Sequence, residues 1–133
     1  MKESNFKMAG KPKLNNIQFE TNNDYKFDDA ISLEINNNVN VNKDEHSHQA
    51  KVILHIGVFT SKEIKEVPFK IEMSIEGYFK WDEELQKNTS LLEKLLKQNA
   101  PAILYSYLRP LITIITTEAD MPPLVIPLMN FVE

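Results

Sequence analysis

His46 and His48 are the two residues whose type and spacing come closest to a reactive site. With Asp44 and Glu45 beside them, they combine the imidazole and carboxylate groups that bind metal ions. The surrounding segment is rich in asparagine, and nothing else in the chain offers the further side chains that hold metal ligands in place. We therefore interpret these residues as part of a solvated loop and expect no metal site.

Covalent and acid–base catalysis find little support in the remaining residues. The chain has no cysteine, which removes disulfides, thiolate nucleophiles and cysteine-based zinc sites together. It has three glycines and no G-x-x-x-x-G-K-S/T pattern, which argues against a phosphate-binding loop. Asp28–Asp29 and Glu83–Glu84 occur where turns or helix starts are expected, and His55 lies within an expected strand. We expect neither an enzyme nor a cofactor.

The overall composition is that of one soluble globular domain. The 133 residues are 42% hydrophobic and 26% charged, and their number suits a single core. A net charge of −4 with scattered basic residues argues against nucleic acid as a partner. No apolar run approaches the about 18 residues that cross a bilayer, and residues 1–14 lack the apolar centre of a signal peptide. We expect a cytoplasmic protein without a membrane partner.

Alternation of apolar and polar residues predicts a sheet between about residue 15 and residue 81. Residues 1–14 are polar and aperiodic, which is typical of a flexible N-terminal arm. The asparagine-rich segment Asn36–Gln49 is expected to be a flexible hairpin connection. Strict alternation predicts strands with one covered and one exposed face in four segments: Asn16–Glu20, Ala30–Asn36, Lys51–Thr60 and Pro68–Phe79.

The periodicity changes after Trp81 and predicts a helical region from about residue 83 to residue 118. Either Asp82 or Thr89–Ser90 can cap its first helix. Pro101 lacks an N–H donor and is expected to interrupt or kink the helical path.

The second half of this helical region is more apolar than one sheet requires. On a helical wheel the apolar residues from Ile103 to Ile115 span about 200°, whereas a helix that covers its own sheet needs about 100°. We expect the surplus to be buried against another subunit, so the sequence predicts an oligomer. The candidate interface residues are Ile103, Tyr107, Leu111 and Ile114.

The segment Met121–Phe131 is apolar but contains three prolines, which exclude a helix and disfavour a central strand. We expect it to lie along an existing hydrophobic surface and to form the wall of a groove. The alternating apolar residues of Pro68–Phe79 have two interpretations: core beneath the helix, or in part an open binding surface.

Four segments, taken in order, resemble motifs of the SecB export-chaperone family over roughly residues 15–131. Pro101–Arg109 is similar to the family's P-x-I-L-F-P-Y-x-R helix segment, and Met121–Phe131 to its F-P-x-L-x-L-x-P-V-N-F segment. Asn16–Glu20 is similar to the early D-I-x-F-E strand. Phe69–Phe79 is similar to the fourth strand, which ends in G-x-F.

The resemblance implies an α+β fold in which a four-stranded antiparallel sheet is packed by a long C-terminal helix. It also implies an oligomer, a homotetramer built as a dimer of dimers. The chaperone domain would cover residues 15–133, with the sheet at about 15–81, the helical region at about 83–118 and a proline-rich apolar loop at 121–131. A client-binding groove would be lined by one sheet face and this loop, through Leu33, Ile35, Phe69, Ile71, Met73, Ile75, Leu124, Ile126 and Phe131.

Contact with the SecA translocase motor is the part of the resemblance that this sequence supports least. The family usually continues into a second helix and an acidic tail that contacts SecA, whereas this sequence ends at Glu133. The family's acidic sheet face is diluted by Asn16 and Lys70, which leaves Glu20 and Glu72 as the candidate contact residues.

The leading hypothesis is therefore a SecB-like chaperone that holds unfolded polypeptides in an apolar groove without nucleotide, with preproteins for export as one candidate class of client. One alternative is a chaperone dedicated to a specific client protein, such as one that serves a toxin–antitoxin pair. Another is a structural oligomer whose groove is filled by its own segment Pro122–Phe131.

Overall fold

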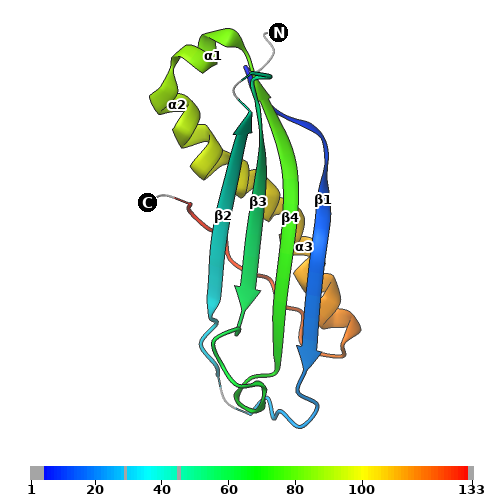
Figure 1. Ribbon diagram of the computed structural model, residues 1–133. Coiled ribbons are helices and arrows are strands. Elements are labelled where there is room, and N and C mark those ends of the chain that lie inside the picture. Colours follow the sequence, from blue (N-terminus) through cyan, green and yellow to red (C-terminus); the bar gives the residue numbers. More distant parts are fainter. Residues whose placement is uncertain (1–4, 29, 45, 132–133) are drawn as a thin grey trace.

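A four-stranded antiparallel sheet forms one layer of the computed structural model, which describes residues 5–28, 30–44 and 46–131. Its strands are β1 (Phe6–Thr21), β2 (Ile35–Asp44), β3 (Gln49–Val58) and β4 (Phe69–Trp81). Their order across the sheet is β1-β4-β3-β2, so β1 and β2 are the edge strands (Figure 1). This layer and the long C-terminal helix confirm the predicted fold class.

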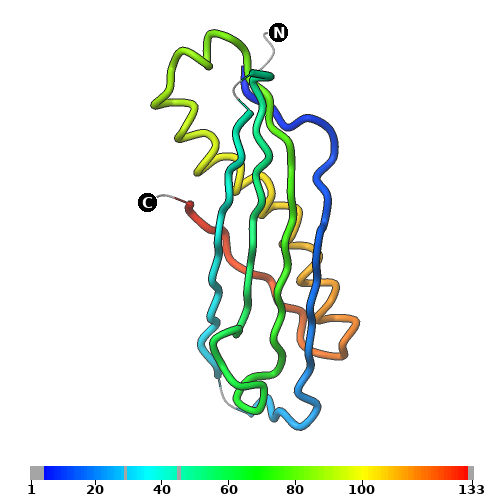
Figure 2. The backbone as a smooth tube through the Cα atoms, in the orientation of Figure 1, coloured from blue at the N-terminus to red at the C-terminus, as the bar shows by residue number. Residues whose placement is uncertain are grey.

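Helices cover one face of the sheet and leave the other face open. A short 3₁₀ turn, η1 (Ile64–Glu66), precedes β4. The covering layer follows β4 and consists of α1 (Glu83–Lys87), α2 (Thr89–Lys94), the π-helical turn η2 (Leu95–Asn99) and α3 (Ala100–Glu118). Figure 2 shows this path crossing diagonally behind the sheet from its β2 side to its β1 side. No helix in the described part of the chain is both long and apolar enough to span a membrane.

The helices α1 and α2 each begin at a residue whose side chain caps the first turn. The Asp82 carboxylate accepts a hydrogen bond of 2.8 Å from the backbone N–H of Leu85, so Asp82 is the cap of α1. At α2 the cap is Asn88, whose side-chain oxygen accepts from the N–H of Leu91 at 3.3 Å, while Thr89 is the first helical residue. The interruption expected near Pro101 takes the form of η2, which lies directly before α3.

The flexible arm predicted for residues 1–14 is wrong for residues 6–14, which belong to β1. Phe6 and Met8 lie opposite Trp81 and Phe79 in β4, and the rings of Phe6 and Phe79 stack at 5.5 Å. Register shifts on either side of Lys13, together with the positive φ of Gly10, break the alternation that marks a strand. Residues 1–4 of the predicted arm lie outside the described residues.

The predicted position of the second strand is also wrong. β2 runs from Ile35 to Asp44, so most of the segment expected to be a flexible hairpin connection is an edge strand, and residues 30–34 before it have no regular structure. Val39 and Val41 lie opposite Leu54 and Val52 and pack against the core, while the alternate residues Asn38, Asn40 and Asn42 are exposed. Asparagine has low strand propensity, and here pairing with β3 outweighs it.

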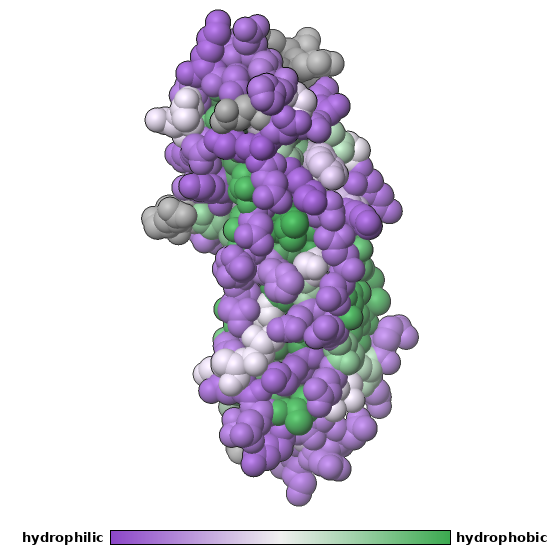
Figure 3. Space-filling view, in the orientation of Figure 1, coloured by the Kyte–Doolittle hydropathy of each residue, from purple (hydrophilic) through white to green (hydrophobic). Residues whose placement is uncertain are grey.

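The core lies between the covered face of the sheet and the helical layer. In β3 and β4 alternate residues are buried, as the alternation predicted. The opposite face is predominantly hydrophilic in Figure 3, which views the sheet from its open side. The largest fully buried side chains include Leu54, Ile56, Ile71, Met73, Phe79, Leu85, Leu96, Leu104, Leu108 and Ile112.

Candidate functional site

An apolar groove of about 220 Å³ lies at the end of the sheet where β4 begins. Three segments that are distant in sequence form it: the irregular connection between β1 and β2, the residues that join β3 to β4, and the start of the C-terminal segment after α3. Its lining is almost wholly hydrophobic, and consists of Phe27, Ile31, Leu33, Phe59, Pro68, Phe69, Met121, Pro122, Pro123 and Leu124. We refer to these residues as the apolar groove.

The rim of the apolar groove consists of hydrophobic side chains that remain accessible to solvent. Phe27, Ile31 and Leu33 are 54%, 42% and 39% exposed. The edge of the Tyr25 ring packs against Phe27 at 5.0 Å between ring centroids. Single exposed apolar residues are ordinary, but three on one segment beside an apolar depression are typical of a binding surface.

Hydrogen bonds hold both ends of this rim segment. At its start the Asn22 amide donates to the carbonyls of Ile64 and Val67, at 3.0 and 3.1 Å. At its end the Glu34 carboxylate accepts from the backbone N–H and the hydroxyl of Ser61, at 3.0 and 2.5 Å. The Ser61 hydrogen bonds lower the pKa of the Glu34 carboxyl below its usual value, so this anchor is charged at neutral pH. The apolar middle of the segment is thus kept at the groove.

Aromatic side chains form the floor of the apolar groove. Phe59 packs edge-on against Phe69 at 5.5 Å, and Phe19 lies on the other side of Phe69 at 5.7 Å. Phe59 has a φ of 59°, a left-handed conformation that is rare for a bulky residue. Because the chain turns here, the consecutive residues Val58 and Phe59 are both buried. The turn therefore directs Phe59 towards the groove instead of continuing the alternation of β3.

The C-terminal segment 121–131 forms the remaining wall and is held by one face of α3. The Thr113 hydroxyl donates to the carbonyl of Leu124 at 2.7 Å, and the Thr116 hydroxyl accepts from the N–H of the same residue at 3.0 Å. Further along, Arg109 Nε donates to the carbonyl of Ile126 at 3.0 Å, and the Tyr105 hydroxyl to that of Pro127 at 2.6 Å. Burial raises the pKa of Tyr105, which keeps its hydroxyl protonated as a donor.

These four helix residues were not identified from the sequence, although their spacing could have indicated them. Tyr105, Arg109, Thr113 and Thr116 follow one another at intervals of three or four residues, which places them on one helix face. Their partners are almost all backbone carbonyls, and a segment interrupted by three prolines has few N–H groups to offer in return. The hydrogen-bonded part of the attachment therefore does not depend on which side chains the segment carries, while the buried Ile126 side chain adds a hydrophobic contact.

The structure places the predicted groove residues in three environments. Leu33, Phe69 and Leu124 line the apolar groove. Ile71, Met73 and Ile75 are buried on the covered face of the sheet, and Ile126 is buried in the same core, so the prediction that they line an open groove is corrected: they are core. The remaining two, Ile35 and Phe131, are partly buried against that core.

Phe131 instead belongs to a second depression, of about 480 Å³, beside the edge strand β2. Its ring packs edge-on against Tyr105 at 5.8 Å, and the neighbouring Met129 accepts a hydrogen bond of 3.3 Å from the Asn37 amide. The depression lies along one side of an edge strand and mixes amide, apolar and cationic groups: Asn37, Asn38, Val39, Val41, Lys97, Asn130 and Phe131.

The predicted interface residues lie mostly on the outer surface of α3. Ile103, Tyr107 and Ile114 are exposed, Ile114 by 55%, whereas Leu111 is partly buried against the core. Their spacing puts the three exposed residues in one row along the helix. We refer to Ile103, Tyr107 and Ile114 as the helix row, and its burial between subunits stays a prediction.

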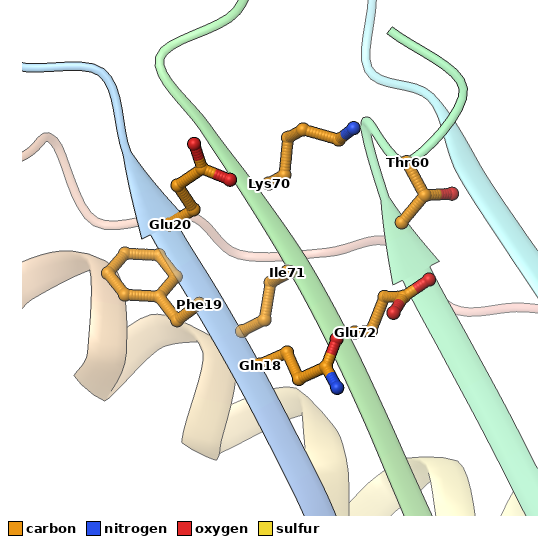
Figure 4. Close-up of a pocket in the computed structure, with 7 residues that line it drawn as sticks. All are labelled: Gln18, Phe19, Glu20, Thr60, Lys70, Ile71 and Glu72. Atoms are coloured by element: carbon orange, nitrogen blue, oxygen red, sulfur yellow. The ribbon is translucent and has the colours of Figure 1, made fainter. Parts of the chain in front are cut away.

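On the open face, a third depression of about 250 Å³ contains the candidate residues for contact with the translocase motor (Figure 4). Glu20 in β1 lies directly opposite Lys70 in β4, and Gln18 lies opposite Glu72. Figure 4 shows Lys70 and Glu72 on β4 with Glu20 beside them on β1. Lys70 therefore interrupts the acidic surface that Glu20 and Glu72 would otherwise form, and contact with the motor stays a prediction.

The residues considered for metal binding lie around the turn between β2 and β3. Asp44 accepts hydrogen bonds from the Ser47 hydroxyl at 2.6 Å and the His46 N–H at 3.2 Å, and these interactions stabilise the turn. Glu45 lies outside the described residues, as does Asp29 of the carboxylate pair considered above. Within the ranges 5–28, 30–44 and 46–131, no three histidine or acidic side chains gather as a metal site requires.

Comparisons with known proteins agree with this architecture. The family model described as "SecB: Preprotein translocase subunit SecB" matches residues 6–133. A protein-export protein SecB of Anaplasma phagocytophilum is 29% identical over 108 residues, which cover 74% of this chain and 68% of the relative. An uncharacterised protein of Methanocaldococcus jannaschii is 27% identical over 119 residues, which cover 88% of this chain and 74% of the relative.

A solved structure has the same fold. It is a Mycobacterium tuberculosis SecB-like chaperone in complex with a ChAD peptide from the HigA1 antitoxin. The two structures superpose with a TM-score of 0.71 over 94% of this chain and 88% of that one, at 12% sequence identity. At this identity the likeness concerns the fold.

Proposed function

The chain belongs to the SecB family, whose members are chaperones and not enzymes, and we propose that it holds unfolded polypeptides in the apolar groove without using nucleotide. The observation that carries the proposal is the exposed rim of Phe27, Ile31 and Leu33, held by hydrogen bonds at both ends beside an apolar floor. A hydrophobic side chain that is fully buried there would contribute about 1.5–3 kcal/mol before the cost of ordering the client.

The second depression supports binding of an extended client. It runs beside the edge strand β2, whose outer backbone groups have no neighbouring strand among the described residues. A client that pairs with such an edge gains backbone hydrogen bonds without regard to its sequence. This suits a chaperone that must accept different polypeptides, among which preproteins for export are one candidate class.

We further propose that the protein is a cytoplasmic homotetramer assembled as a dimer of dimers. The helix row supports the subunit contact, because Ile103, Tyr107 and Ile114 form a line of apolar side chains on the outside of α3. Several grooves on one particle would bind one unfolded chain together, so weak contacts gain from a high effective concentration.

Substitution of two rim residues tests the holding function. Phe27→Ser with Ile31→Ser should remove most of the ability to suppress aggregation of a slowly refolding protein, as followed by light scattering. The matched control is Leu91→Ser with Tyr78→Ser, since both residues are exposed and hydrophobic but lie outside the groove. Equal loss in both variants, or none in the first, would contradict the proposal.

A chaperone dedicated to one partner is the second candidate function. It is favoured by Lys70, which interrupts the acidic surface between Glu20 and Glu72 and weakens the case for contact with SecA. Capture of several unrelated denatured proteins supports the general function, and capture of a single partner supports the dedicated one. A structural oligomer that fills its own groove would leave the fluorescence of ANS, a dye that binds exposed apolar surface, unchanged.

A further inference from the structure

Three lysines gather at one end of the open face of the sheet. Lys7 in β1 lies directly opposite Lys80 in β4, and the side chains of both are exposed. Lys51 in β3 lies opposite Tyr78, which precedes Lys80 by two residues in β4. Their neighbours Met8, Phe79 and Ala50 point to the covered face, so the three lysines share the open one. We refer to Lys7, Lys51 and Lys80 as the lysine cluster.

The lysine cluster has no internal counterion in the part of the chain that the structure describes. None of the three forms an ion pair with another described residue. Two carboxylates at the same end of the sheet are engaged elsewhere, because Asp44 accepts hydrogen bonds within its own turn and Asp82 caps α1. Like charges directly opposite in a sheet are about 4.5–5.5 Å apart at their Cβ atoms and destabilise the pair. This arrangement costs stability unless an external anion neutralises it.

The groups around the lysine cluster suit carboxylates on a polypeptide. Tyr78 is exposed at the centre of the cluster, and Asn42 lies across β3 from it, opposite Lys51. Ammonium and amide groups donate to carboxylates, while the tyrosine ring offers flat contact to a peptide backbone. We propose that the lysine cluster is a docking surface for an acidic segment of another polypeptide.

The charges along the rest of the open face favour a short acidic peptide over a nucleic acid. Beyond the cluster, the same face carries the carboxylates of Glu76, Glu72 and Glu20, with Lys13 opposite Glu76 and Lys70 opposite Glu20. A phosphate backbone that continued along the sheet would meet these carboxylates, whereas a short acidic segment ends before them. The surface lies on the opposite side of the sheet from the core and the helical layer. A partner bound here therefore leaves the apolar groove accessible.

Charge reversal tests this docking surface in the whole protein. A labelled oligoglutamate peptide should bind with an affinity that falls as salt is added, measured by fluorescence anisotropy. The triple variant Lys7→Glu, Lys51→Glu, Lys80→Glu should bind it at least about tenfold more weakly. The control carries the same change at Lys65, Lys87 and Lys94, which are exposed lysines elsewhere, and should bind as the unaltered protein does.

Several results would overturn the proposal. They are absence of peptide binding by the unaltered protein, equal weakening in the control, or tighter binding of an oligothymidylate of the same length that also depends on the cluster. If charge reversal unfolds the chain, as judged by circular dichroism, the triple change to Gln is used with the same expectation. The variants should still suppress aggregation, which separates a failure of this surface from a failure of the groove.

Discussion

The Tyr105 hydroxyl donates a 2.6 Å hydrogen bond to the backbone carbonyl of Pro127, which ties the middle of α3 to the C-terminal segment. Arg109 and Thr113 make equivalent bonds along the same helix face. The segment that walls the apolar groove is thus fixed by side chains of α3 acting on its main chain.

Removal of the Tyr105 hydroxyl should loosen this wall. Tyr105→Phe deletes the donor and keeps the ring against Phe131, so the free energy of unfolding should fall by about 0.5–1.5 kcal/mol in urea titrations. Amide exchange at residues 124–128 should accelerate. Tyr107→Phe is the control, since the Tyr107 side chain is exposed on the opposite side of the helix, and an equal effect there would contradict the role of Tyr105.

A side chain at Gly77 should force α3 away from the sheet. A Cβ at this position would lie 3.0 Å from Leu104 Cδ2 and 3.3 Å from Met8 Sδ, closer than packed carbon atoms normally approach. Gly77→Val should therefore lower the free energy of unfolding by about 1–3 kcal/mol. In a Leu104→Ala background the added cost should shrink, because the space is then available. Additive losses in the double variant would show that the contact is not responsible.

Acid should weaken the hydrogen bonds between the Glu34 carboxylate and Ser61. Hydrogen bonds from Ser61 lower the folded-state pKa of Glu34, so its contribution to stability is complete above the ordinary pKa of about 4.3 and is lost as the pH falls through the folded value. In an NMR titration, Ser61→Ala should raise the pKa of Glu34 towards its ordinary value. Ser32→Ala, in the same segment, should leave it unchanged. A Glu34 pKa that is the same in all three proteins would refute this account.

Charge on the helix row should dissociate the oligomer. Ile114→Glu places a carboxylate in an apolar contact and should shift the particle mass, measured by light scattering, towards the 15.4 kDa of one chain. Ser90→Glu, at an exposed position in α2 away from the helix row, is the control for added charge. An unaltered protein that is already monomeric at working concentration would remove the basis of this prediction.

The sequence correctly predicted the two strands that have a neighbouring strand on both sides. Strands β3 and β4 are central, so one face is buried along their whole length and apolar residues recur at alternate positions. The edge strands were misplaced for physical reasons. Bulges interrupt the apolar–polar alternation of β1 near Gly10. The exposed asparagines of β2 give that strand the composition of a loop.

The candidate site was predictable to a similar degree. Leu33, Phe69 and Leu124 were found through the resemblance to the SecB family, and each belongs to a segment with several apolar residues. Phe27 and Phe59 were missed, because no periodic pattern includes them: one lies in an irregular connection, and the other depends on a left-handed turn. Conversely, Ile71 and Met73 alternate as a binding face would, but the helical layer covers them, and the sequence pattern alone does not distinguish the two outcomes.

The way in which α3 holds segment 121–131 has a consequence for changes in client preference. Because the hydrogen bonds of the attachment are made mostly to main-chain carbonyls, the exposed side chains at Pro122 and Pro123 are free to vary while the segment keeps its position. Mutation or laboratory selection at these two positions can therefore reshape one wall of the groove and retune which polypeptides it accepts, with little penalty to folding.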